Sequence, residues 1–199
     1  MPCPLIRNLA TLLIVLLLNA CATPGIGLTL PPDAEQQRIG DLGRSISALH
    51  PSIDTDEAQR AARIAIEYSR ELANQYQVSG SALFHNLMVN LGVKDRGLCI
   101  DWTADLKTRL ELERFTSLDL HWAIANYENP FRLEHSTVIV SSLGATFEQG
   151  IVLDPWRYSG RLFWSPALSD VEYGWRARAE VHALKRLHQA EAADNLVNR

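Results

Sequence analysis

Residues 120–154, LHWAIANYENPFRLEHSTVIVSSLGATFEQGIVLD, carry the pattern that decides the fold. Side chains alternate between large apolar and smaller or polar ones over residues 120–125, which is typical of a half-buried strand. A second β-rich run covers His135–Ser141, and a third covers Phe147–Leu153 after a Leu143-Gly144 turn. Three strands with short connections predict an antiparallel meander.

Helical patterns lie on both sides of this meander. Apolar residues recur at three- and four-residue steps, and Asp54 with Glu57 forms a capping-box-like start for the longest segment. The expected helices are Ala34–Leu49, Thr55–Gln77, Ser81–Leu91, a segment from about Cys99 that carries Trp102, Leu106 and Leu110, and a C-terminal helix at Val171–Leu196. Helices that precede a run of strands predict the α+β class.

The first twenty residues have the features of a secretion signal. Arg7 is their single charged side chain, and Leu9–Leu18 is an apolar run of about ten residues, too short to span a bilayer as a helix. The next residues, Leu18-Asn19-Ala20-Cys21, resemble the lipobox of bacterial lipoproteins, whose cysteine is lipidated after cleavage.

This resemblance implies that the chain has three parts. We expect residues 1–20 to be a signal peptide, residues 21–33 a flexible tether lipid-anchored at Cys21, and residues 34–199 a single domain. The chain would then be exported across the inner membrane and anchored on the periplasmic side, at the outer membrane because Ala22 follows the cysteine.

The net charge of the chain limits the classes of partner that it is expected to bind. The formal net charge is −4 at pH 7, which argues against a nucleic-acid partner and against a patch for anionic membranes. We therefore expect contact with the membrane through the lipid anchor only.

Cys99 is left without an intramolecular partner, because Cys3 leaves with the signal and Cys21 takes the lipid. It is either an inert buried residue or a reactive thiol. Its expected place in the first turn of a helix favours the thiolate, and Arg96 lies nearby. Asp101, roughly 200° round the helix, should point away from the sulfur.

His135 and Asp154 are the candidate partners of this thiol. His135 opens the second strand and Asp154 closes the third, so antiparallel pairing would make them neighbours at one end of the sheet. A thiol nucleophile needs an imidazole as base and a carboxylate that holds its tautomer. The alternative is a strand-end histidine and a turn-forming aspartate without chemistry.

Three stretches resemble the bacterial transglutaminase-like cysteine proteinases. Gly97–Trp102 resembles their Gly-x-Cys-x-Asp-aromatic motif, Glu134–Val140 their His-led strand, and Val152–Trp156 their Asp-Pro strand end. The resemblance implies a papain-like or transglutaminase-like core, in which a nucleophile-bearing helix packs on a three- or four-stranded antiparallel sheet. It also implies a Cys-His-Asp triad that attacks an amide or peptide bond through a thioacyl intermediate, with a peptide or protein of the envelope as substrate and no cofactor.

Five further residues are candidates for the same site. Asn86 or Asn90 could add an oxyanion donor to the backbone amide of the nucleophile. Trp102, Trp156 and His121 could line a substrate cleft, and His121 is also a rival base.

The sequence also has to be compared with two alternatives to a triad enzyme, a metal site and a domain without catalysis. A metal site is not expected, because no two candidate ligands have the short spacing of zinc sites. The remaining alternative is a domain of this kind that no longer catalyses and acts as an envelope scaffold or binding lipoprotein.

Overall fold

The computed structural model describes residues 32–197. The predicted signal peptide, the Cys21 anchor and the tether up to residue 31 lie outside the described residues. The helices are α2 (Pro32–Ser47), α3 (Thr55–Gln75), α4 (Ala82–Asn90), α5 (Cys99–Glu111) and α6 (Arg178–Val197). The strands are β1 (Leu118–Ala125), β2 (His135–Ser142), β3 (Ile151–Asp154), β4 (Phe163–Pro166) and β5 (Arg176–Ala177). Over this part of the chain the fold is α+β, as predicted.

The strands form one antiparallel sheet in the order β4-β3-β2-β1-β5. The long pair β1 and β2 runs in register from Leu118 opposite Ser142 to Ala125 opposite His135. Every residue of the central strand β2 is buried. The sheet therefore places His135 at the first residue of a strand that is buried throughout.

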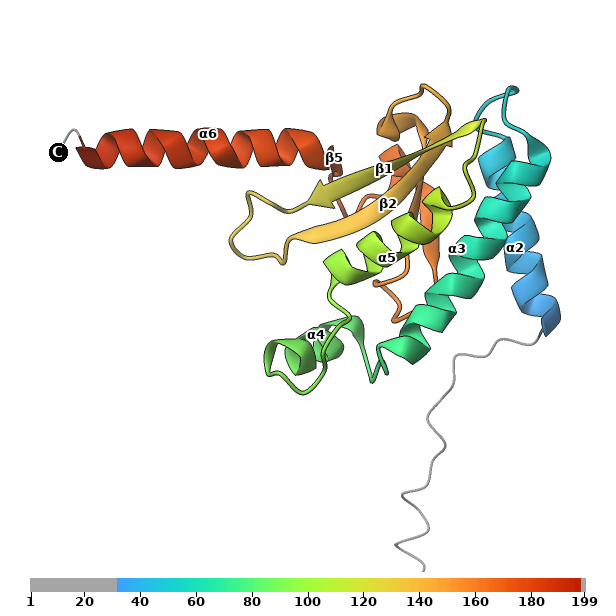
Figure 1. The fold of residues 1–199 in the computed structure, drawn as a ribbon, viewed down its shortest axis with the longest axis horizontal. Coiled ribbons are helices and arrows are strands. Elements are labelled where there is room, and N and C mark those ends of the chain that lie inside the picture. Colours follow the sequence, from blue (N-terminus) through green and yellow to red (C-terminus); the bar gives the residue numbers. More distant parts are fainter. Residues whose placement is uncertain (1–31, 198–199) are drawn as a thin grey trace, which may run out of the picture. The chain divides into compact units, whose positions relative to one another are not determined.

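Side chains on the two faces of the sheet enter different clusters. Val138, Val140 and Leu153 pack on the face that the helices cover. Here α5 packs on β1 and β2, α3 packs on α5, and α2 packs on α3 (Figure 1). Ile139 and Val152 point to the opposite face, where they meet the C-terminal segment rather than a helix layer.

Three sequence expectations are corrected by this fold. The sheet has five strands instead of three or four. Within the predicted third strand, Phe147–Gln149 forms a 3-10 turn, so that only Ile151–Asp154 is extended. The last helix begins at Arg178 and not at Val171, because the chain first adds β5 to the edge of β1. Among the described residues no helix is both long and apolar enough to cross a membrane.

Glu57 joins the start of α3 to the segment that leads into β1. The N-cap half of the predicted capping box is confirmed, since the Asp54 side chain accepts from the Glu57 backbone N–H at 2.9 Å, but the Asp54 N–H donates to Ser117 Oγ instead of to Glu57. The buried Glu57 carboxylate accepts the N–H and the hydroxyl of both Thr116 and Ser117, at 2.7–3.0 Å. Burial alone would raise the pKa of Glu57, but these four hydrogen bonds lower it to about 2.

We predict that Glu57→Gln lowers the free energy of unfolding by about 1–3 kcal/mol, because an amide NH2 faces donors that then lack an acceptor. The folded-state pKa lies below the ordinary 4.5, so the contribution of Glu57 is present above that value and is lost as the pH falls towards 2. Urea unfolding at pH 7 and pH 3 measures both effects. The exposed neighbour Asp56, changed to Asn, is the control, and an equal loss in both variants would contradict the role of Glu57.

Candidate active site

Cys99 is the first residue of α5, which confirms its predicted position in the first turn of a helix. Leu98 at the N-cap has no side-chain acceptor, and the carboxylate of Asp101 takes over this role. Its Oδ2 accepts the backbone N–H groups of Gly97 and Leu98, each at 3.0 Å. The negative charge of Asp101 is thus turned to the backbone that leads into the helix.

Arg96 is engaged elsewhere. Its guanidinium donates to both carboxylate oxygens of Asp105 at 2.9 Å and lies 3.7 Å from Asp101. Its charge is therefore largely balanced by carboxylates rather than available to the thiol.

Gly97 is required for the chain to enter α5 in this way. Its φ of +125° lies in a region that L side chains rarely adopt, and a Cβ would lie 2.3 Å from Nε2 of the buried His85. That nitrogen donates to the carbonyl of Arg96 at 2.9 Å, and the Trp102 indole donates to the carbonyl of Gly97 at 3.0 Å. The carbonyl groups of Arg96 and Gly97 are thus both held by hydrogen bonds from side chains, just before the nucleophile.

The structure brings His135 and Asp154 together on the sheet face away from the helices. They are 1% and 0% exposed, and His135 Nε2 donates to Asp154 Oδ2 at 2.8 Å. The other ring nitrogen, Nδ1, is buried and has no hydrogen-bond partner among residues 32–197. The Cys99 thiol lies at the start of the same strand, with Sγ 3.6 Å from the carbonyl of Glu134.

The pKa of His135 reflects these neighbours. Burial alone would lower it, but the charge and hydrogen bond of Asp154, followed by the adjacent Cys99, raise it to about 9.

Three aromatic rings enclose the imidazole. The ring centroids of Trp156, Tyr173 and Trp175 lie 4.6, 4.7 and 5.5 Å from that of His135. The Trp156 indole donates to Asn86 Oδ1 at 2.9 Å and so ties the rings to α4. The rings exclude water from the His135–Asp154 pair and hold the plane of the imidazole.

Sequence reasoning missed Arg157, which completes the surroundings of Asp154. Its Nε donates to Asp154 Oδ2 at 3.0 Å, and its Nη2 donates to Asp170 Oδ2 at 2.7 Å. Burial would raise the pKa of Asp154, but His135 and Arg157 outweigh that effect and lower it. The one local signal was the spacing of Asp154 and Arg157, three residues apart.

The structure does not bring all of the remaining predicted site residues to the Cys99–His135–Asp154 group. Trp102 does not line a cleft: it is 1% exposed and packs edge-on against Tyr76 with ring centroids 4.9 Å apart, because it belongs to the core face of α5. His121 hydrogen-bonds Ser141 at 2.7 Å in a separate hollow beside α6, and no described contact links it to Cys99 or Asp154. Trp156, in contrast, packs on His135.

The two asparagines of α4 also differ from each other. Asn86 is half-buried and its Oδ1 is occupied by the Trp156 indole, whereas Asn90 is exposed at the end of the helix. Asn86 therefore acts here as a support for Trp156.

Comparison with protein-family models, with curated proteins and with solved structures found no match for the chain. Within residues 32–197 no group of three or more His, Cys, Asp or Glu side chains is placed to hold a metal ion. The chemistry of the site is therefore argued from its own geometry.

We predict that Gly97→Ala destabilises the protein by at least about 2 kcal/mol, through the unfavourable φ and the overlap with His85. Gly92→Ala is the matched control, because Gly92 also has a positive φ of +72° but nothing lies within 4 Å of an added Cβ. Thermal or urea unfolding compares the two variants. Equal losses would show that the contact with His85 is unimportant.

We also predict that the His135 imidazole titrates with a pKa near 9 in NMR spectra of its ring protons. Cys99→Ala should lower this value moderately, and Asp154→Asn should lower it further, because each removes a group that favours the imidazolium. His121, whose pKa is lowered by burial, serves as an internal reference. Titration of His135 near 6.5 in the unmodified protein would refute the assigned coupling.

Proposed function

We propose that this chain is a cell-envelope lipoprotein enzyme that attacks an amide or peptide carbonyl through Cys99. The observation that carries the proposal is the two-sided environment of the His135 ring. Nε2 is committed to Asp154, while Nδ1 is buried with no hydrogen-bond partner in the described part of the chain, and Cys99 lies close enough to raise the pKa of the ring. This is the arrangement that a thiol nucleophile requires of its base.

The reaction would proceed through a thioacyl intermediate. His135 holds the thiol proton as an imidazolium, and the thiolate of Cys99 adds to the carbonyl carbon of the substrate. The backbone N–H of Cys99, at the start of α5, is the candidate donor to the developing oxyanion. The imidazolium then protonates the leaving amine, and water or a second amine attacks the thioester and restores the thiol.

Asp154 keeps the imidazole in the productive tautomer. Its hydrogen bond to Nε2 directs the other nitrogen, Nδ1, away from the carboxylate, and its charge favours the imidazolium. The order of elements agrees with a papain-like or transglutaminase-like core: the nucleophile at a helix start, the base at the start of a strand and the acid at the end of the next. Membership of that superfamily and the envelope location remain part of this proposal.

A second candidate is a scaffold or binding lipoprotein of the same fold that does not catalyse. One observation favours it: His135 is only 1% exposed beneath its aromatic neighbours, and the thiol is directed to the Glu134 carbonyl. In this alternative the buried charges serve stability alone.

We predict that the full-length protein cleaves members of a mixed peptide-amide library or transfers their acyl groups. Mass spectrometry of the products measures this turnover. Cys99→Ala should reduce turnover by about 10³-fold or more while leaving the circular dichroism spectrum unchanged. Ile46→Val, a core change in α2 outside the triad and its supports, is the control for indirect effects. Full turnover by Cys99→Ala, or no turnover and no thioacyl adduct with the unmodified protein, would contradict the enzyme and favour the scaffold.

A further inference from the structure

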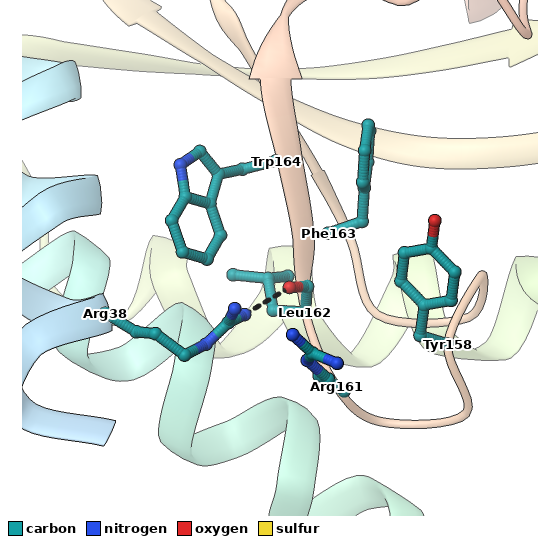
Figure 2. Close-up of a pocket in the computed structure, with 6 residues that line it drawn as sticks. All are labelled: Arg38, Tyr158, Arg161, Leu162, Phe163 and Trp164. Carbon is teal, nitrogen blue, oxygen red and sulfur yellow. Dashed lines mark hydrogen bonds between the residues drawn. The ribbon is translucent and has the colours of Figure 1, made fainter. Parts of the chain in front are cut away.

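A second hollow lies between α2 and the chain that connects β3 to β4. It has a volume of about 450 Å³ and is lined by Arg38, Tyr158, Arg161, Leu162, Phe163 and Trp164. This volume is within the range of roughly 300–1,000 Å³ that is usual for small-molecule sites. Figure 2 shows the guanidinium groups of Arg38 and Arg161 close together near the start of β4, with Trp164 on one side of the strand and Phe163 and Tyr158 on the other.

Both arginines lack a carboxylate partner among the described residues. Arg38 Nη2 donates to the carbonyl of Leu162 at 2.6 Å, which holds the side chain in place but leaves its charge unbalanced. The nearby carboxylates are engaged elsewhere, Glu35 by Arg70 and Asp41 by Arg44.

The two like charges oppose each other. Burial lowers the pKa of Arg38 and the charge of Arg161 lowers it further, and together they outweigh the opposite effect of the Glu35 and Asp41 carboxylates. Arg157, only four residues from Arg161, differs from Arg38 and Arg161 because it forms ion pairs with Asp154 and Asp170. An anion between Arg38 and Arg161 would relieve this repulsion, and paired guanidinium groups match the oxygens of a carboxylate or a phosphate.

Aromatic rings lie on both sides of β4, which separates Trp164 from Phe163 and Tyr158. The Trp164 ring lies with its centroid 4.5 Å from the Arg38 guanidinium carbon. Tyr158 and Phe163 meet edge to face at 6.1 Å, and Tyr158 is 53% exposed. Such rings bind flat apolar surfaces.

We propose that this hollow binds a small organic anion whose carboxylate or phosphate lies between Arg38 and Arg161 and whose apolar body lies on the exposed ring of Tyr158. The site is separate from Cys99 and does not depend on the proposed enzyme activity. The ligand class follows from charge and shape together: a bare anion would leave the exposed Tyr158 ring uncovered, and a neutral ring would leave Arg38 and Arg161 without an ion pair.

Isothermal titration of the full-length protein with phenyl phosphate and with phenylacetate, the anion of phenylacetic acid, tests this proposal. Measurable binding of either probe is expected, with inorganic phosphate and benzyl alcohol at least about tenfold weaker, because each lacks one half of the ligand. Arg161→Gln and Arg38→Gln should each weaken the bound probe by about tenfold or more. Arg114→Gln, which removes the same charge from an exposed residue outside the hollow, should leave affinity unchanged.

Three results would overturn the proposal. They are failure of both probes to bind, binding that Arg161→Gln leaves intact, and binding of inorganic phosphate as tight as that of phenyl phosphate. Arg161 is exposed, so Arg161→Gln keeps the test decisive even where Arg38→Gln disturbs the contact of α2 with Leu162.

Discussion

The carboxylate of Asp154 carries a charge at a point that solvent does not reach, and the surrounding structure compensates it. His135 and Arg157 both donate to Oδ2, and Arg157 is in turn held by Asp170. The Trp175 indole donates to the same Asp170 carboxylate at 3.1 Å. Removing one partner of a buried ion pair typically costs about 3–5 kcal/mol, so this network fixes the chain between β3 and β5 as well as the histidine.

A second constraint brings the nucleophile to this network. The positive φ of Gly97, its contact with His85 and the Asp101 carboxylate together set where α5 begins. Cys99 is therefore held by backbone geometry, while His135 is held by a buried charge. The proposed chemistry depends on these two independently supported groups being neighbours.

The parts of the site that sequence could predict are those with local signals. The β-rich runs of β2 and β3, together with antiparallel geometry, place His135 near Asp154, and the glycine before Cys99 indicates a helix start. In contrast, β4 has four residues and β5 has two, which is too short for any period to be read. The bonds of Arg157 to Asp170 and of Asp170 to Trp175 leave no pattern either, because they form only when distant turns pack together.

The most direct test of the central claim is the ultraviolet absorbance of the Cys99 thiolate as a function of pH, taken as the difference between the full-length protein and its Cys99→Ala variant. If Cys99 and His135 form a thiolate–imidazolium pair, the thiolate signal persists at neutral and mildly acidic pH and is lost there in His135→Gln. A thiolate that appears only near the ordinary thiol value of about 8.5, equally in the unmodified protein and in His135→Gln, would contradict the claim.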